Sequence, residues 1–499
     1  MEQLSGQDAM FLHMELEGLP QHIGGVSIYD QGTAPNGIVR FKQILSTIEN
    51  RLHLSDIFTR KLEAVPMGLS RPYWVEDADF DLEYHVRHIA LPKPGDWRQL
   101  CILAARLHSR PLDRSRPLWE FYVIEGLDNV EGLPSNCFAL LLKVHHCAMD
   151  GATGAQFMNV MHDFTPDIAM HNNIPPRIIE RPSKGYMLGR AYVDAWKKPA
   201  QTFDMLKQAL PTYQRLKSGR ENQDFHELDE KQKTRFQGKI SPHRSVEARR
   251  FAFEDIRAIK NAVPGATIND AMLTIVAGGL QKYLRSKGEL PEQTLVAGCP
   301  IDVRSPEERA AGGNMVGFMN VALRTDIDSP LKRLKAVHEE SQSAKAYAEA
   351  LGPRIAIDLT DVMPGNVLSL ALRAASATGL AEASVIQNTV VTNVPGAPMQ
   401  LFLCGAELVD SFSLGPLLPN VGLFHIVYSS VQNKEGRITL SFTACRDMLP
   451  DPGFYAQCLR ESFEELKAAT VKAEAKTKAK PATKSGEKSA KKKNAAQPA

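Results

Sequence analysis

The chain has 499 residues, of which 43% are hydrophobic and 23% are charged, a globular balance that excludes disorder of the whole chain and favours two domains. The formal net charge of +2 hides an asymmetry, because residues 467–499 hold ten Lys against two Glu. The remaining 466 residues carry a net charge of −6, which argues against a nucleic-acid-binding protein.

Cysteine spacing and hydropathy indicate the cellular compartment in which the protein works. The seven cysteines are scattered and form no CxxC pair, which argues against a zinc ribbon or a redox dithiol. The first ten residues, MEQLSGQDAM, lack the basic and apolar regions of a signal peptide, and no run of about 18 apolar residues occurs. We therefore expect a cytoplasmic protein with free thiols and no membrane-spanning segment.

Residues 1–165 have the pattern of a mixed α/β domain. Residues 121–127, FYVIEGL, have strand composition. Residues 138–144, FALLLKV, form a short and nearly continuous apolar run, which predicts a buried strand. Residues 152–163 follow Gly151 and place Ala and Met at every third position, which predicts a helix.

Residues 166–248 change character and predict a long crossover between two halves. Within them, residues 191–217 interleave apolar side chains with Lys and Arg, which predicts an amphipathic helix. We expect Pro199 and Pro211 to break or kink it. Such helical segments either pack on their own protein or lie on a membrane surface.

Residues 249–467 have the pattern of a second α/β half. The predicted helices cover residues 267–284 and 367–378, and the predicted strands cover residues 295–299, 424–431 and 438–444. Residues 389–391 lead into a turn that the NVPG sequence of residues 393–396 predicts.

Residues 468–499 consist largely of Ala, Lys, Thr, Ser and Pro. This composition is too poor in apolar side chains to form a core and predicts a disordered basic tail. Such a tail either contacts an anionic membrane or remains a solvated extension.

One short sequence carries the pattern of a catalytic site: HHCAMDG at residues 145–151. It follows the predicted buried strand and precedes a predicted helix, which places both imidazoles at the end of a strand. An imidazole with a pKa of about 6.5 is suited to accept a proton near neutral pH. Asp150 lies beside Gly151, which permits a tight backbone turn, and is well placed to hold the loop. The alternative is that both histidines are loop residues with purely structural hydrogen bonds.

Two other chemistries compete at the same residues. Cys147 could act as a nucleophile beside a histidine base, although neighbouring residues of an extended segment point to opposite sides. His145, His146 and Asp150 could bind a metal ion, but no motif supplies a further ligand. We therefore expect no metal.

The HHxxxDG pattern resembles the signature of the CoA-dependent acyltransferase superfamily, which includes chloramphenicol acetyltransferase, carnitine acyltransferases and peptide-synthetase condensation domains. Further motifs resemble those of the bacterial wax ester synthase/diacylglycerol acyltransferase family, in family order from residue 4 to about residue 465. They are LSGQDAMF (4–11), RPLWE (116–120), TIND (267–270), PIDVR (300–304), GN (313–314), TNVPG (392–396, with Thr for the family's Ser) and CRD (445–447).

The resemblance implies an α/β fold of two chloramphenicol-acetyltransferase-like domains, with mixed sheets and a tunnel at their interface. Long-chain acyl-CoA would enter from one side and a fatty alcohol or diacylglycerol from the other. No cofactor is implied beyond acyl-CoA as co-substrate. We expect peripheral contact with a membrane or lipid inclusion and no nucleic-acid partner.

The resemblance also assigns roles. His146 would be the general base that deprotonates the acceptor hydroxyl as it attacks the thioester. The thiolate of CoA is a good leaving group, so no acyl-enzyme is needed. His145 would shape the site, while Asp150, with Gly151, would point away from the substrate and fix the loop, with Arg304 as its expected partner.

Two further residues have more than one interpretation. Asn269 contacts substrate, braces the site or simply caps a helix. Trp119 is expected in the core rather than in the site.

Two rival functions remain. One is an acyltransferase of the same superfamily that uses carrier-bound or polyketide substrates, against which the LSxxDAxF and PLW motifs argue. The other is a non-catalytic lipid-droplet protein of the same fold, against which the intact HHxxxDG argues.

Overall fold

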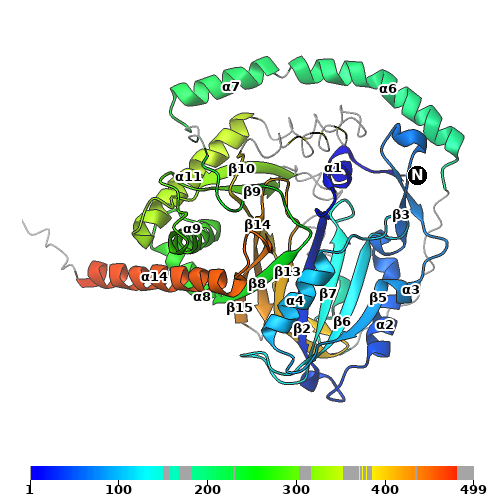
Figure 1. The fold of residues 1–499 in the computed structure, drawn as a ribbon, viewed down its shortest axis with the longest axis horizontal. Helices are drawn as coiled ribbons and strands as arrows, with labels where there is room; N and C mark the ends of the chain where they lie inside the picture. Colours follow the sequence, from blue (N-terminus) through cyan, green and yellow to red (C-terminus); the bar gives the residue numbers. More distant parts are fainter. Residues whose placement is uncertain are drawn as a thin grey trace, which may run out of the picture.

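The structure is a computed structural model of the chain. It describes residues 2–149, 158, 160–167, 181–207, 209–225, 228, 231–302, 316–351, 370, 374, 378, 385–432 and 435–479. Among these residues it contains two six-stranded mixed sheets with helices around them, which confirms the predicted α/β class (Figure 1).

The first sheet combines strands from both ends of the chain. Its order is β12-β13-β2-β7-β6-β5. The strands are β2 (His22–Asp30), β5 (Val86–Ala90), β6 (Trp119–Leu127), β7 (Cys137–His145), β12 (Phe402–Leu403) and β13 (Ala406–Leu414). Because β13 pairs antiparallel with β2, residues of the predicted second half complete the sheet of the first. The sequence division did not predict this exchange.

The second sheet has the order β10-β9-β11-β14-β15-β8. Its strands are β8 (Arg244–Ala252), β9 (Val296–Asp302), β10 (Val316–Ala322), β11 (Thr389–Pro395), β14 (Leu423–Gln432) and β15 (Glu435–Cys445). β11 runs parallel to β9 and β14, while β10, β15 and β8 pair antiparallel. A small third sheet joins β1 (Glu2–Gln3), β4 (Tyr73–Glu76) and β3 (Arg60–Glu63).

The predicted turn at residues 393–396 is wrong, because β11 continues through Pro395 in parallel register with β14. Gly396 serves close packing instead. Its amide donates to the carbonyl oxygen of Ser429 at 2.7 Å, and a Cβ atom at this position would lie 2.4 Å from the Tyr428 ring. Only glycine fits such an approach of backbone to ring.

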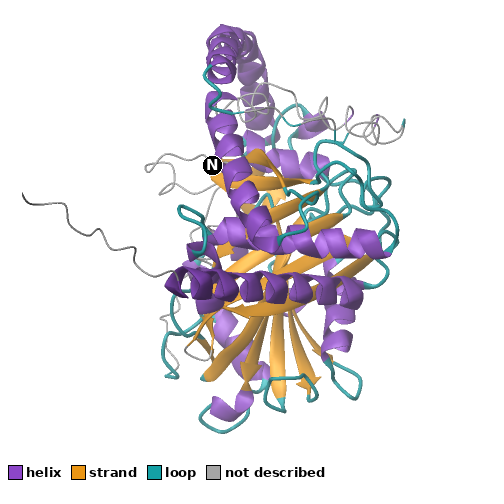
Figure 2. Cartoon of the chain, turned by 90° about the vertical axis from the view of Figure 1, so that its left-hand side faces the viewer, coloured by secondary structure: helices purple, strands orange, loops and turns teal. Residues whose placement is uncertain are grey.

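Helices cover the outer faces of the sheets (Figure 2). The longer ones are α1 (Gly6–Met14), α2 (Phe41–Glu49), α4 (Trp97–His108), α8 (Phe253–Asn261), α9 (Ile268–Ser286), α11 (Pro330–Leu351) and α14 (Pro452–Ala479). Short ones are α3 (Leu82–His85), η1 (Gln31–Thr33), η2 (Leu52–Leu54), η3 (Asp56–Phe58) and η4 (Pro66–Gly68). α9 lies within the largest apolar core, between the second sheet and α14.

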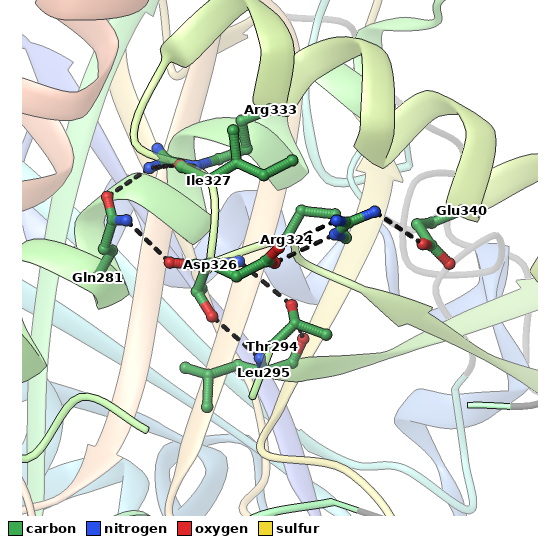
Figure 3. A network of polar contacts seen from close by, with 9 residues as sticks. Gln281, Thr294, Leu295, Arg324, Asp326, Ile327, Arg333 and Glu340 are labelled. Carbon is green, nitrogen blue, oxygen red and sulfur yellow. Dashed lines mark hydrogen bonds and ion pairs between the residues drawn. The ribbon is translucent and has the colours of Figure 1, made fainter. Parts of the chain in front are cut away.

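A polar network fixes α9 to the loop between β10 and α11 (Figure 3). Gln281 donates to the carbonyl oxygen of Thr325 at 2.8 Å, and the Arg333 guanidinium donates to that of Ile327 at 2.9 Å. Arg324 pairs with Asp326 at 2.9 Å and with Glu340 of α11 at 3.4 Å. These contacts link α9 and α11 through the loop between β10 and α11.

The crossover forms two long helices, α6 (Lys184–Lys207) and α7 (Ala209–Glu221), that arch away from the rest of the protein (Figure 1). Pro199 does not end α6, which follows a curved path instead. Pro211 is the third residue of α7, where the missing amide has no intrahelical partner to lose.

α14 runs past residue 467, where we expected the folded part to end, and reaches Ala479. The sequence there is rich in Ala and Lys, which are strong helix formers. Thr470 is buried, and its hydroxyl donates to the carbonyl oxygen of Leu466 at 3.0 Å. Residues 480–499, the rest of the predicted tail, lie outside the described residues.

Across the described helices, a search for a stretch both long and apolar enough to cross a bilayer finds none.

Candidate active site

A cavity of about 760 Å³ lies between the two halves. Its walls come from α1, β2, β7 and β13 on one side and from β9, β10, β11 and β14 on the other. Most of the lining is apolar, including Met10, Leu142, Met149, Phe318 and Phe424. A cavity of this size with a largely apolar lining suits an apolar ligand that has few polar groups. A passage open at both ends, as the predicted tunnel requires, stays a prediction.

The backbone places the two histidines at the end of β7. His145 is the last residue of the strand, and its amide donates to the carbonyl oxygen of Leu118 at 2.9 Å. The His146 amide donates to the carbonyl oxygen of Gln21 at 2.8 Å. The leucine of the PLW motif thus anchors the strand end at which the histidines lie.

His146 lies in the cavity wall, and α1 holds its ring. The Phe11 ring stacks on the imidazole with a centroid distance of 3.9 Å and an interplanar angle of 3°. Phe11 is the last residue of the LSGQDAMF motif, and Ser5 of that motif caps α1 by accepting from the Asp8 amide. The N-terminal motif therefore orients the imidazole that faces the cavity.

His145 turns to different surroundings, as expected for neighbours on an extended segment. Its Nδ1 accepts from the Cys147 amide at 3.1 Å, so its proton resides on Nε2, which donates to Glu15 Oε2 at 2.6 Å. Arg114 pairs with the same oxygen at 3.0 Å. We call Arg114, Glu15 and His145 the anchor triad.

Burial and charge keep the anchor triad in one protonation state. Burial lowers the pKa of His145, and its neutral form is the one in the structure. Burial alone would raise the pKa of Glu15, but the hydrogen bond from His145 and the charge of Arg114 outweigh it and lower that pKa. Glu15 therefore stays ionised, and His145 acts as a fixed donor.

Cys147 has the surroundings of a core residue. The side chain is buried beside Leu4, Ala9 and Leu118. Burial raises the pKa of its thiol well above the ordinary value, so the nucleophilic thiolate is disfavoured. The alternative of a cysteine nucleophile finds no support in this geometry.

A second histidine, His162, lies in the cavity wall and is fully bonded. Its Nδ1 donates to the carbonyl oxygen of Met158 at 2.6 Å, and its Nε2 accepts from the Tyr29 hydroxyl at 2.5 Å. Burial lowers the pKa of His162 to about 4. Both ring nitrogens are engaged, so this histidine closes the wall rather than offering a base.

Several of the other residues that the sequence predicted for the site are not described by the structure. Asp150, Gly151 and Arg304 lie outside the described residues, as do residues 313–314 and the predicted helix at residues 367–378, apart from three isolated positions of that helix. The described part of the chain holds no group of three His, Cys, Asp or Glu residues placed to bind a metal ion. Trp119 is fully buried in the core, with its indole N–H donating to the carbonyl oxygen of Phe58 at 3.0 Å.

Asn269 is neither the cap of α9 nor among the described residues that line the cavity. Thr267 caps the helix, and Asp270 completes the capping box by accepting from the Thr267 amide at 2.9 Å. Asp270 also lies 2.9 Å from Nδ1 of His338 on α11. In the TIND motif it is therefore Asp270 that makes the bracing contacts.

Sequence reasoning missed Glu15 and Arg114. Glu15 lies 130 residues from His145 along the chain, and no local spacing relates the two. A buried histidine needs a partner for each ring nitrogen, which is the one signal that could have prompted a search for an acid.

Comparison with known proteins agrees with this arrangement. Residues 4–272 match the family model of the wax ester synthase/diacylglycerol acyltransferase catalytic domain, and residues 312–467 match its C-terminal domain. A putative diacylglycerol O-acyltransferase of Mycobacterium tuberculosis is 30% identical over 93% of this chain and 90% of its own. A homologue of the same description from Mycobacterium bovis is 30% identical over 94% of this chain and 99% of its own.

Solved structures show the same fold. The wax ester synthase/diacylglycerol acyltransferase from Marinobacter aquaeolei aligns with a TM-score of 0.65 at 24% identity, covering 94% of this chain and 100% of that one. A starter condensation domain of rhizomide synthetase aligns with a TM-score of 0.54 at 13% identity, covering 95% of each chain. The chain therefore belongs to the wax ester synthase/diacylglycerol acyltransferase family and is an acyltransferase.

Proposed function

We propose that the protein transfers a long-chain acyl group from acyl-CoA to the hydroxyl of a fatty alcohol or diacylglycerol, with His146 as general base and without an acyl-enzyme. The observation that carries this proposal is the position of the His146 imidazole in the wall of a largely apolar cavity that both halves line. Its ring stacks on that of Phe11, which holds it in the cavity wall.

The steps follow from the chemistry of a thioester. His146 takes the proton of the acceptor hydroxyl as the oxygen attacks the thioester carbonyl carbon. The tetrahedral intermediate collapses by breaking the carbon–sulfur bond, and the departing CoA thiolate takes the proton from the imidazolium. One ester and one CoA thiol result, and the enzyme returns to its starting state.

The surrounding residues have positioning roles in this proposal. The anchor triad fixes the ring of His145 and, through the backbone, the start of the loop that carries His146. Asp150 and Gly151 are proposed to fix the end of that loop, with Arg304 as the partner of Asp150. Asn269 is proposed only as part of the helix start that Asp270 braces. No metal and no cofactor beyond acyl-CoA take part.

The test is CoA release from palmitoyl-CoA in detergent, with hexadecanol or dipalmitoylglycerol as acceptor. His146→Ala should lower kcat by roughly 10²–10⁴-fold. The matched control is His243→Ala, because His243 is exposed and is not among the described residues of the cavity wall. Release that does not depend on the acceptor, or a His146→Ala enzyme with most of its turnover, would overturn the proposal. A covalent acyl adduct after mixing with acyl-CoA alone would do the same for the mechanism.

Both acceptors are lipids that collect in membranes and inclusions. We therefore also propose that the protein is cytoplasmic and works in peripheral contact with such a surface.

A further inference from the structure

The helix α6 makes few contacts with the body that it crosses, whereas α7 packs on α11. Among the α6 residues whose side chains are described, only Met187 and Ala191 are buried, and they pack with Val65 and Tyr73 of the first half. At the other end, the Phe225 ring, just past α7, meets Tyr347 of α11 at a centroid distance of 5.2 Å. The two helices thus form an arch that spans both halves of the molecule (Figure 1).

The arch exposes large aromatic side chains. Trp196 is 71% exposed, Tyr192 is 66% exposed, and Tyr213 of α7 is 64% exposed. Tyr192 and Trp196 lie one helical turn apart with ring centroids 6.2 Å from each other. A monomer in water rarely presents such large rings to solvent, whereas Trp and Tyr are favoured at the interface between lipid and water.

The charge of the arch fits an anionic partner. Residues 184–221 hold eight Lys and Arg against three Asp and Glu, a net charge of +5. The rest of residues 1–466 then carries −11, because that stretch as a whole is at −6. A basic segment with exposed aromatic rings on an otherwise acidic protein is typical of a surface that binds anionic lipid. A second copy of the chain that docked through the same segment would bring another positive charge, which disfavours self-association there.

Two apolar residues of the cavity lining are exposed. Phe318 of β10 and Ile386 line the cavity and are 51% and 66% exposed. α1 and β10, which both contribute to the cavity wall, lie below the arch in Figure 1. Lipid held against the arch would therefore lie at the same end of the molecule as these two elements of the cavity wall.

We propose that the exposed face of α6 that carries Tyr192 and Trp196 docks the enzyme on an anionic lipid surface. The inference extends the proposed function by naming the surface through which lipid acceptors are met. Aromatic side chains enter the headgroup layer, and the basic side chains of the arch pair with lipid phosphates.

Vesicle binding of the full chain tests this directly. We expect co-sedimentation with vesicles in which about a third of the lipid is phosphatidylglycerol, and weaker binding to pure phosphatidylcholine or at high salt. Tyr192→Ser/Trp196→Ser should lower the partition constant roughly tenfold. The matched control is Leu54→Ser/Ile102→Ser, which removes two exposed apolar side chains on η2 and α4. Equal binding of the two double variants would overturn the proposal.

Tryptophan fluorescence provides a second test that needs no loss of binding. The chain has four tryptophans: Trp119 is fully buried, and Trp74 and Trp97 are half-buried. Brominated acyl chains should therefore quench mainly Trp196. Trp196→Phe keeps an aromatic ring and should keep most of the binding, but it should abolish the quenching. Quenching that persists in Trp196→Phe would place another part of the protein in the lipid.

Activity separates this inference from the proposed function. The Tyr192→Ser/Trp196→Ser enzyme should keep its turnover in detergent and lose it roughly tenfold when the acceptor is presented in anionic vesicles. Loss of all activity in detergent, in wild type as well, would count against the proposed function and leave the vesicle result standing. If the arch instead mediated self-association, the double variant would change oligomeric state without changing vesicle binding.

Discussion

The end of β7, where His145 and His146 lie, is called the corner below. Its side chains are held in place by neighbours, whereas large side chains of the arch of α6 and α7 are exposed. At the corner, both ring nitrogens of the buried His145 have hydrogen-bond partners, and the Phe11 ring stacks on that of His146. On α6, large aromatic rings face solvent and few of the described side chains touch the body. Proton transfer needs groups fixed within fractions of an ångström, whereas a lipid surface has no fixed shape to match.

This difference predicts that chemistry and lipid contact can be lost separately. His146→Ala should reduce kcat by roughly two to four decades in detergent and in vesicles alike, because the base is absent in both settings. Its vesicle binding should equal that of wild type, since His146 belongs to the cavity wall. Kinetics and co-sedimentation on the same preparations measure both. A His146→Ala protein that no longer bound vesicles would join the two regions functionally and break the comparison.

The anchor triad sharpens the account of the corner. Glu15→Leu leaves the buried Nε2–H of His145 without its acceptor, which should lower the free energy of unfolding by about 1–3 kcal/mol. A shifted loop should also lower kcat about tenfold with little change in KM. Glu15→Gln retains an acceptor oxygen and should recover most of both losses.

The matched control for this series is Glu17→Leu, because Glu17 is exposed two residues away. Urea unfolding and steady-state kinetics are the measurements. If Glu15→Leu matched wild type in both, the anchor triad would have no positioning role.

Both the fold class and the place of His145 at the end of a strand followed from the sequence, for local reasons. The apolar run at residues 138–144 predicted β7 to within one residue at each end, and the polar residues after it marked the strand end. The buried role of Trp119 also agrees with expectation. These features depend on neighbours along the chain, which composition and periodicity describe.

What the sequence did not yield depends on contacts between distant residues. The insertion of β13 beside β2 and the pairing of Glu15 with His145 join residues far apart, and a single sequence carries no signal for either. At Gly396, a glycine needed for close packing has the same local appearance as a glycine needed for a turn.

A buried histidine outside both regions, His425, predicts that the protein loses stability in acid. Burial lowers the pKa of His425 to about 3, with Tyr455 donating to its Nε2 at 2.7 Å. The unfolded chain binds a proton at this residue below about pH 6.5, while the folded one does not, so stability falls as pH drops from about 6.5 toward 3.

His425→Gln removes one such group and should make the fall shallower by about 1.4 kcal/mol per pH unit over that window. His243→Gln, at an exposed position, should leave the slope unchanged. Urea denaturation at a series of pH values measures both slopes. Parallel curves for wild type and His425→Gln would show that the imidazole is protonated in the folded state.

The smallest expected effect concerns the end of α14. A chain that ends at residue 479 keeps the whole described helix and should match wild type in stability and in detergent turnover. A chain that ends at residue 467 loses buried Thr470 and the last turns of the helix, so its free energy of unfolding should fall by about 1 kcal/mol. Turnover in detergent should remain, because α14 is not among the described elements of the cavity wall. Equal stability of the two shortened chains would mean that the helix beyond residue 467 adds nothing to the fold, and it would restore residue 467 as the boundary of the folded part.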